Sequence, residues 1–424
     1  MARFAVPGLQ RLAALAGLLL AVACAVTPAR SPPQAAPAPA APSPPAAVPP
    51  QPTPFEAFLA QMHAEAQAAG IREDVFQAAT AAIAPVPSIV AMNDNQPEFS
   101  RPVWAYLDSA VSARRIKDGQ ALLAQYGDTL AGIERQSGVP REILVAIWGM
   151  ESDYGRAAGS FNLFAALATL GYQGPRAAYA KPEFQAALKI MQDQRYAAAA
   201  MTSSWAGAFG QTQFTPTTFL KYAADGDHDG RIDLWSSPAD ALASAANLLS
   251  SQGWASHGHW CMEAALPGSF AYADAGLETV KPLAEWQRRG VRLANGGDLP
   301  RGGDAAIYLP AGAKGPAFLV FPNFKVLLKY NNAASYALAV SLLGDRIMGR
   351  PGIQAGWPRG DRPLSRDERM RFQQALAAAG FDPGAPDGIL GQRTRGATRA
   401  YQQAHGLVAD GYPTADLLAT MEAQ

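Results

Sequence analysis

Apolar residues recur at helical spacing through most of the chain from Phe55 onward. Phe58, Met62 and Ala66 share one face of a predicted helix within residues 55–84, because positions three to four apart lie on the same side of a helix. The same periodicity, rich in alanine, recurs in segments 103–137, 161–171 and 182–196. The pattern predicts a mainly α-helical core.

Two short apolar runs depart from this helical pattern. Residues 306–310 and 317–320 are brief and hydrophobic, and glycines lie between them, which is typical of a β-hairpin. We therefore expect a mainly α (α+β) fold with a small β piece.

One acidic residue ends an apolar helical stripe. Pro140 suits the first turn of a helix, and Leu144, Trp148 and Glu151 then follow on one face. Burial and the negative end of the helix dipole both raise the pKa of such a carboxyl. A carboxyl that stays protonated near neutral pH can donate a proton to a leaving group. The alternative is a partly solvated Glu at a fraying helix end.

Residues 203–216 combine small residues with hydrogen-bonding side chains, among them Ser204 and Gln213. A cleft in which hydroxyl and amide groups of a ligand approach the backbone needs this combination. The alternative for this segment is a Gly-rich connector.

An Asp-rich segment follows directly. Asp225, Asp227 and Asp229 alternate, Gly comes sixth, and a further Asp comes ninth, which is the spacing of an EF-hand calcium loop. The twelfth position holds Ser236 instead of Glu, so Asp240 is the candidate for the missing ligand. The spacing predicts a calcium site, and plain Asx-turns are the alternative.

The N-terminus resembles an export signal, residues 1–23. A basic start precedes the apolar run 12–22, which is too short to span a membrane. The run ends at Ala21-Val22-Ala23-Cys24, which favours a bacterial lipoprotein lipidated at Cys24, and an ordinary A-x-A cleavage site is the alternative. In other lipoproteins, an Asp after the lipidated Cys retains the protein at the inner membrane. Ala25 stands at that position here, which predicts that the protein is anchored in the outer membrane. Residues 24–54 form a Pro/Ala-rich tether.

The charge balance excludes some partners. Lys and Arg number 35, as do Asp and Glu, so no basic excess indicates nucleic acid. If Cys24 carries lipid, Cys261 has no intramolecular partner, and no disulfide framework is expected.

A second domain, residues 364–424, follows a Gly/Pro linker at 351–363. Ser365 and Glu368 form a capping box for one helix, and Thr394 is expected to cap another. The motifs Phe372-Gln373-Gln374 and Tyr401-Gln402-Gln403 form a weak repeat. This domain resembles the small three-helix peptidoglycan-binding module of wall hydrolases; a generic helical docking module is the alternative.

Four motifs together resemble the membrane-bound lytic murein transglycosylase B family across residues 55–350. They are Ile-Trp-Gly-Met-Glu-Ser-Asp-Tyr-Gly (147–155), Ser-Trp-Ala-Gly-Ala-Phe-Gly-Gln-Thr-Gln-Phe (204–214), the Asp-rich loop ending at Trp235, and Tyr-Asn…Tyr-Ala (330–337). The resemblance implies a lysozyme-like helical core in the periplasm of a Gram-negative bacterium. It also implies cleavage of the β-1,4 bond between N-acetylmuramic acid and N-acetylglucosamine in peptidoglycan. We expect the protein to be a monomer.

The resemblance also assigns residues. It implies that Glu151 is the single acid/base and that the substrate-binding positions are Ser204, Gln213, Asn331 and Tyr336. It implies calcium ligands at Asp225, Asp227, Asp229, Asp240 and the carbonyl of Arg231. The chain departs from the family in having Arg231 where His is common and one extra residue between Trp235 and Asp240.

One carboxylate suffices if the substrate supplies the nucleophile. A hydrolytic glycosidase ordinarily needs two, and Asp153 points away from Glu151 if the helix continues. As in the family, the C6 hydroxyl of the muramoyl sugar would attack C1 and give a 1,6-anhydro product. This reaction is favoured because the hydroxyl and C1 belong to the same sugar and are already close together. The alternatives are a hydrolytic muramidase that uses water and a non-catalytic protein that anchors to the cell wall.

Overall fold

The computed structural model describes residues 53–94 and 101–423. The predicted signal peptide, the lipidation site Cys24 and nearly all of the tether lie outside these residues. Within the described part of the chain, no helix is both long enough and apolar enough to cross a bilayer.

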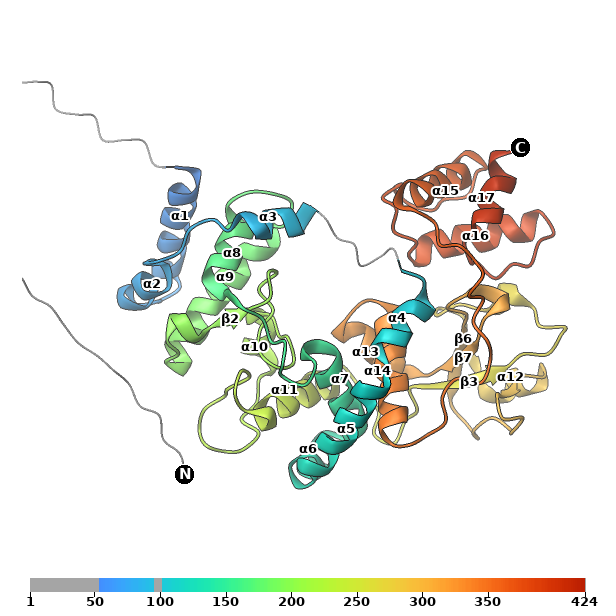
Figure 1. The fold of residues 1–424 in the computed structure, drawn as a ribbon, viewed down its shortest axis with the longest axis horizontal. Coiled ribbons are helices and arrows are strands. Elements are labelled where there is room, and N and C mark those ends of the chain that lie inside the picture. Colours follow the sequence, from blue (N-terminus) through green and yellow to red (C-terminus); the bar gives the residue numbers. More distant parts are fainter. Residues whose placement is uncertain (1–52, 95–100, 424) are drawn as a thin grey trace, which may run out of the picture. The chain divides into compact units, whose positions relative to one another are not determined.

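Helices make up most of the described chain, as predicted (Figure 1). Those before the C-terminal domain are α1 (Pro54–Ala68), α2 (Glu73–Thr80), α3 (Pro87–Asp94), α4 (Val103–Ala110), α5 (Ala113–Gln125), α6 (Gly127–Ser137), α7 (Arg141–Ser152), α8 (Leu163–Tyr172), α9 (Ala177–Gln194), α10 (Pro216–Tyr222), α11 (Pro238–Ser251), α12 (Leu283–Arg288), α13 (Pro322–Tyr330) and α14 (Ala334–Ile347). The segment 55–84 divides into two helices at Gly70, whose φ of 78° suits a helix end.

The helix that carries Glu151 lies inside one large hydrophobic cluster. Leu144 and Trp148 of α7 are buried there together with Leu338 and Leu343 of α14. A second cluster joins α1, α2, α8 and α9, where Phe184 contacts the rings of Phe58 and Phe164 edge-on. The apolar stripes seen in the sequence therefore face these two cores.

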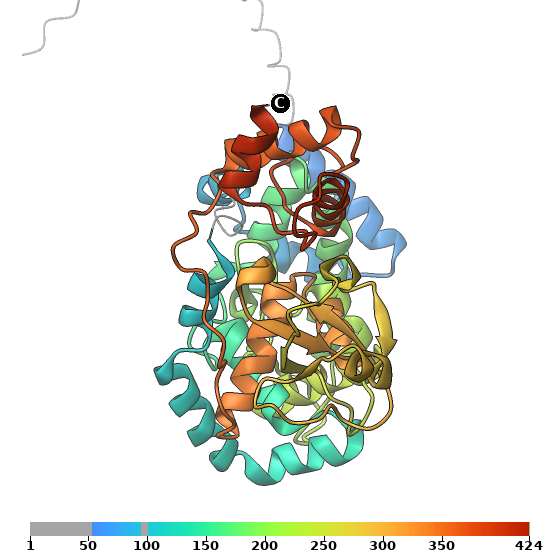
Figure 2. The same cartoon turned by 90° about the vertical axis from the view of Figure 1, so that its right-hand side faces the viewer.

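The β piece is larger than the predicted hairpin. The expected pair, β6 (Asp304–Tyr308) and β7 (Ala317–Val320), is antiparallel as predicted. It belongs to a five-stranded sheet of order β4-β6-β7-β3-β5, completed by β3 (Cys261–Ala265), β4 (Val280–Pro282) and β5 (Arg292–Leu293). Side chains of β6 and β7 join the cluster that holds α13 and α14, the orange helices of Figure 2. Cys261 is buried as a free thiol.

The C-terminal domain contains the three predicted helices, α15 (Arg366–Ala378), α16 (Gln392–Ala404) and α17 (Ala415–Glu422). The capping box of Ser365 and Glu368 is present. The prediction that Thr394 caps the second helix is wrong, because α16 begins at Gln392 after Gly391. Thr394 is buried within the first turn, and its hydroxyl donates to the carbonyl of Pro383 at 3.2 Å.

The weak sequence repeat corresponds to a repeated hydrogen-bond pattern. The Gln373 amide donates to Asp387 at 3.0 Å and accepts the N–H of Gly388 at 2.8 Å. In the second half, the Gln402 amide donates to Asp410 at 2.9 Å and accepts the N–H of Gly411 at 2.7 Å. Each buried Gln thus fixes one Asp-Gly turn.

Residues 351–363 contain no helix or strand, but they form hydrogen bonds and ring contacts with the domain that precedes them. The Glu263 carboxylate on β3 accepts the N–H groups of Gln354 and Ala355 at 2.7 and 2.8 Å. Farther along, the ring of Trp357 lies 6.3 Å from that of Trp104, and Arg359 forms two hydrogen bonds with Asp108, both partners being on α4. We call this segment the strap.

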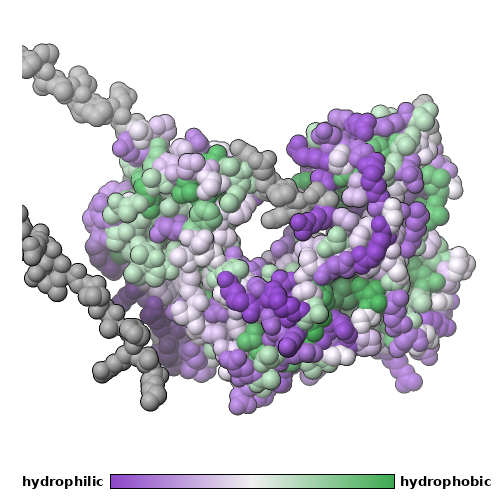
Figure 3. Space-filling view, viewed as in Figure 1, coloured by the Kyte–Doolittle hydropathy of each residue, from purple (hydrophilic) through white to green (hydrophobic). Residues whose placement is uncertain are grey.

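The surface shows no extended apolar face in the view of Figure 3. Hydrophobic residues form separate patches between hydrophilic ones. Exposed large hydrophobic side chains are few among the described residues, and three of them, Ile389, Leu407 and Val408, lie in the C-terminal domain.

Candidate active site and calcium loop

Glu151 lies in the last turn of α7, which ends at Ser152. Asp153 follows with a φ of 50°, so the chain turns sharply just after the carboxyl. Glu151 remains partly exposed, whereas Leu144 and Trp148 on the same helix are buried. The apolar stripe therefore leads to an acid at the edge of the core, as predicted.

The Glu151 carboxylate accepts a hydrogen bond from the hydroxyl of Tyr336, in the first turn of α14. Desolvation raises the pKa of Glu151 to about 7, although the Tyr336 hydrogen bond acts in the opposite direction. Near neutral pH a substantial fraction of this carboxyl is therefore protonated, as a general acid requires.

A second tyrosine supports the first. The ring of Tyr330, at the end of α13, is stacked on that of Tyr336 at a centroid distance of 6.4 Å and an angle of 11°. The Tyr330 hydroxyl donates to the carbonyl of Thr212 at 2.7 Å. This contact ties the α13–α14 junction to the segment that carries Ser204 and Gln213.

The end of α7 is tied to the same segment. The Ser152 hydroxyl donates to the carbonyl of Gln211 at 2.6 Å and accepts the N–H of Gly155 at 2.9 Å. Three parts of the chain that are distant in sequence, 151–155, 203–214 and 330–336, therefore converge beside Glu151.

Gln213 has an unusual backbone conformation for its residue type. Its φ is 49°, a region that residues other than Gly adopt rarely. Its side-chain amide donates to the carbonyls of Ala158 and Gly210 at 3.0 and 2.9 Å. The amide thereby joins the loop after α7 to the 203–214 segment, and its carbonyl oxygen is the group suited to receive a ligand donor.

The other predicted substrate positions lie on the same segments. Ser204 closes a short loop, with its hydroxyl accepting the N–H of Ala208 at 3.2 Å. Asn331 is exposed at the junction of α13 and α14, directly after Tyr330. Tyr336 is buried, and its hydroxyl is directed to Glu151. Only Tyr336 contacts Glu151 directly, and the contacts of all four positions with substrate stay a prediction.

Asp153, the carboxyl nearest to Glu151 in sequence, serves a different purpose. It contacts three guanidinium groups, those of Arg114 at 2.9 Å, Arg115 at 3.6 Å and Arg156 at 3.1 Å. The hydrogen bond from Arg114, with that from Arg156, lowers the pKa of Asp153 to about 2. Asp153 is thus a fixed anion in an ion-pair network and is unsuited to proton transfer.

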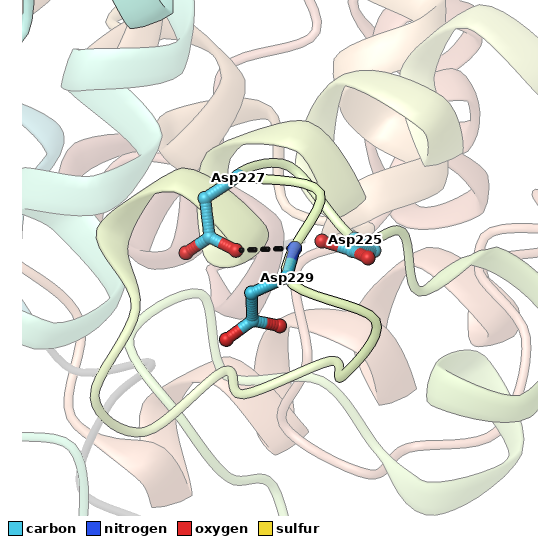
Figure 4. A group of neighbouring side chains, drawn as sticks. All are labelled: Asp225, Asp227 and Asp229. Atoms are coloured by element: carbon cyan, nitrogen blue, oxygen red, sulfur yellow. Dashed lines mark hydrogen bonds between the residues drawn. The ribbon is translucent and has the colours of Figure 1, made fainter.

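The Asp-rich loop places three carboxylates together (Figure 4). Asp225, Asp227 and Asp229 each offer an oxygen, and these oxygens lie within 4.8 Å of one another. The N–H of Asp229 donates to Asp227 at 3.3 Å, and that of Gly230 donates to Asp225 at 2.9 Å. The Oδ1 atom of Asp225 is buried without a hydrogen-bond partner in the described residues, so a cation would satisfy it.

The remaining predicted calcium ligands have other contacts. Both carboxylate oxygens of Asp240 accept backbone N–H groups, from Gly226 at 2.8 Å and from Asp233 at 2.6 Å. Asp240 thereby holds the two ends of the loop together, and burial raises its pKa. The Arg231 guanidinium lies 4.8 Å from the ring centre of Tyr196. The roles of Asp240 and the Arg231 carbonyl as ligands stay predictions.

Comparison with known families matches two parts of the chain. Residues 54–345 match the family described as Transglycosylase SLT domain, which covers more than half of the chain. The chain belongs to the transglycosylase SLT family. Residues 365–421 match a peptidoglycan binding domain.

Individual relatives agree with this assignment. Over 282 residues, covering 61% of this chain and 74% of the relative, the chain is 30% identical to membrane-bound lytic murein transglycosylase B of Escherichia coli (strain K12). The structure of SltB3 from Pseudomonas aeruginosa in complex with NAG-anhNAM-pentapeptide has a TM-score of 0.84 at 48% identity, over 87% of this chain and 99% of SltB3. Lytic transglycosylase SLT35 of Escherichia coli in complex with calcium has a TM-score of 0.59 at 27% identity, over 70% and 92%.

These matches confirm the resemblance inferred from the motifs and the lysozyme-like, mainly α fold. Two residues of the SLT domain that the motifs contained but did not single out are Ser152 and Tyr330. Both could have been chosen as candidates because each is next in sequence to a predicted site residue: Ser152 follows Glu151, and Tyr330 precedes Asn331. Their roles depend on contacts with backbone carbonyls across the site, which no spacing rule predicts.

Proposed function

We propose that this chain is a lytic transglycosylase that cleaves the β-1,4 bond between N-acetylmuramic acid and N-acetylglucosamine in peptidoglycan, with Glu151 as the single acid/base. The observation that carries the proposal is a half-buried carboxyl whose pKa is about 7 and whose partner is a tyrosine hydroxyl. The other acid nearby, Asp153, is held ionised by arginines. The presence of NAG-anhNAM-pentapeptide in the related SltB3 structure supports a 1,6-anhydro product.

The reaction needs one proton shuttle and no water. Protonated Glu151 donates its proton to the glycosidic oxygen as the C1–O bond breaks, and the N-acetyl group of the muramoyl sugar stabilises C1. The Glu151 carboxylate then accepts the proton of the sugar's C6 hydroxyl while O6 bonds to C1. Glu151 returns to its starting state, and the Tyr336 hydrogen bond stabilises the intermediate carboxylate.

Mass spectrometry of muropeptides released from purified sacculi tests this function. We expect products that end in 1,6-anhydromuramic acid. Products with reducing ends would show that water is the nucleophile and that the chain is a hydrolytic muramidase. Binding without any release would identify a non-catalytic anchoring protein.

We further propose that calcium is held by Asp225, Asp227 and Asp229, with the Arg231 carbonyl and Asp240 as the remaining candidates. The unpaired Asp225 oxygen supports the proposal. The ion would have a structural role, because the loop leads into Leu234, whose carbonyl accepts the N–H of Gln211 in segment 203–214 at 2.8 Å.

Removal of calcium should therefore destabilise the fold. We expect a chelator to lower the melting temperature by several degrees, because an ion that binds only the folded state at about 100 times its Kd stabilises that state by about 2.7 kcal/mol. An Asp227→Asn variant should show a smaller response. An unchanged melting temperature in the wild type would contradict the calcium proposal.

We also propose where the protein is located and what it binds. The membrane-bound relative and the predicted lipoprotein signal support a periplasmic protein anchored to the outer membrane through Cys24, and the C-terminal domain supports binding to glycan strands. We propose that it acts as a monomer.

A variant that ends at Pro363 separates binding from catalysis. Since the strap and the whole Glu151 site remain, we expect sedimentation with sacculi to fall severalfold, while cleavage of short soluble glycan fragments stays close to wild type. Equal loss of both would contradict the assignment of wall binding to residues 364–424.

A further inference from the structure

Helices α7 and α14 contact each other at both of their ends. The end of α7 meets the start of α14 where Tyr336 donates to Glu151. The start of α7 meets the end of α14 at Gly344, where an added Cβ would lie 3.3 Å from the Glu142 carbonyl oxygen. The two helices therefore run antiparallel, and the catalytic pair occupies only one end of their interface.

An ion-pair cluster occupies the other end. Arg350 Nη2 lies 3.1 Å from Glu142 Oε1 and Nη1 lies 2.7 Å from Asp345 Oδ1, so one cation joins carboxylates on both helices. The Glu142 side chain is 8% exposed. The guanidinium lies 5.6 Å from the ring centre of Trp260. Two titratable groups lie next to the cluster. Burial and Arg350 lower the pKa of His259, and burial and Asp345 raise the pKa of Cys261.

The two contacts between α7 and α14 are equally far apart along each helix. Glu151 lies nine positions after Glu142 on α7, and Asp345 lies nine positions after Tyr336 on α14. At about 1.5 Å per residue each interval spans roughly 13.5 Å, so both contacts form at the same relative position of the two helices. Since the residues between them are buried in one packed cluster, a shift at one end is transmitted to the other.

We propose that Arg350 is a positioning residue that sets the register of α14 against α7 and so holds the Tyr336 hydroxyl on the catalytic carboxyl of Glu151. The inference rests on the proposed function, because it concerns the protonation of the general acid. Arg350 itself lies at the far end of both helices and acts only through them.

The loss of Arg350 has a defined consequence. Glu142 and Asp345 would repel each other without their shared cation, and the end of α14 would move. The groups that face Glu151 are Tyr336 from α14 and Tyr330 from α13, and Tyr106 of α4 faces Tyr336. Because the Tyr336 hydrogen bond lowers the pKa of Glu151, its weakening raises that pKa and keeps the general acid protonated to higher pH.

The test is the pH dependence of anhydro-product release by the full-length protein. We expect activity to fall at alkaline pH, where Glu151 loses its proton. Arg350→Met and Tyr336→Phe should each shift this alkaline limb of the pH–activity profile to higher pH by about one unit. The double variant should show no larger shift than either single one, and Arg350→Lys should restore much of the wild-type profile. Arg359→Met is the matched control, because it removes an exposed ion pair in the strap at Asp108 and should leave the limb unchanged.

Several outcomes would overturn the inference. If Arg350→Met lowers the melting temperature but leaves the alkaline limb of the pH–activity profile unchanged, the role of Arg350 is purely structural. If the shifts of the two single variants add up in the double variant, Arg350 and Tyr336 affect the pKa of Glu151 independently. If Arg350→Met does not fold, Glu142→Gln tests the same cluster by removing one carboxylate. Failure of the wild type to form anhydro products would instead refute the proposed function, so the two failures are distinguishable.

Discussion

Glu151→Gln should reduce release of anhydromuropeptides by roughly 10²–10⁴-fold, because positioned general acid–base catalysis contributes about that much. Gln has nearly the same shape as Glu and can accept the Tyr336 hydrogen bond, so the geometry should persist. Turnover of sacculi, followed by product mass, gives the measurement. Wild-type turnover by this variant would show that Glu151 is not the acid.

The same variant should be more stable than the wild type above neutral pH. The pKa of Glu151 is raised from 4.5 to about 7, so the folded wild type binds this proton more tightly than the unfolded chain and loses stability as pH rises from about 4.5 through 7. The loss is about 1–3 kcal/mol at about pH 8, and Gln avoids it. The difference in melting temperature should narrow at about pH 4–5.

Asp153→Asn is the matched control for Glu151→Gln. It also replaces a carboxylate by an amide, two residues farther on, and Asn tolerates the φ of 50° at this position. We expect it to weaken the contacts with Arg114 and Arg156 but to retain most of the turnover. A loss as large as that of Glu151→Gln would indicate a second catalytic carboxylate and favour the muramidase alternative.

Phe209→Ala should lower the free energy of unfolding by about 3–5 kcal/mol, the usual cost of truncating a fully buried Phe. Phe209 is fully buried in the cleft segment and is stacked on Trp235 at 4.5 Å and 10°. It therefore joins the segment of Ser204 and Gln213 to the end of the Asp-rich loop. Denaturant unfolding measures the loss.

Phe184→Ala provides the comparison for Phe209→Ala. Phe184 is equally buried, but it packs on Phe58 and Phe164 in the helical core. Both variants should lose similar stability, whereas only Phe209→Ala should also lower turnover measured well below its melting temperature and weaken the response to chelator. Equal turnover in the two would mean that Phe209 does not connect segment 203–214 with the Asp-rich loop.

The fold and the position of Glu151 could be predicted because they depend on local periodicity. Leu144 and Trp148 are buried as the stripe predicts, and Glu151 follows on their side of the helix. The stripe did not show that α7 is buried on all sides from Glu142 to Gly149. The Asp225–Asp229 spacing likewise predicts a local cluster of oxygens. Such features arise within one helix or one loop, where neighbours in sequence are neighbours in space.

Contacts between distant segments could not be predicted. Tyr336 was indicated as a substrate-binding position, but that its hydroxyl donates to Glu151 depends on how α14 packs against α7. Asp240 is a predicted calcium ligand, but the sequence did not show that both of its oxygens also accept backbone N–H groups at the ends of the loop. The cap assigned to Thr394 was wrong because Gly391 lets the helix begin earlier.

The strap also determines how mechanical load would travel through the protein. Tension on the C-terminal domain from a bound glycan strand would first load its direct contacts with residues 310–313, made by Arg395 and Asp410. Along the chain it would then reach Arg359 and Trp357 of the strap, which contact α4, and after them the two N–H groups held by Glu263 on β3. These contacts of the strap would have to break one after another. Only then would force reach Arg350 and α14, so the strap shields the helix that carries Tyr336 from the pull of the wall.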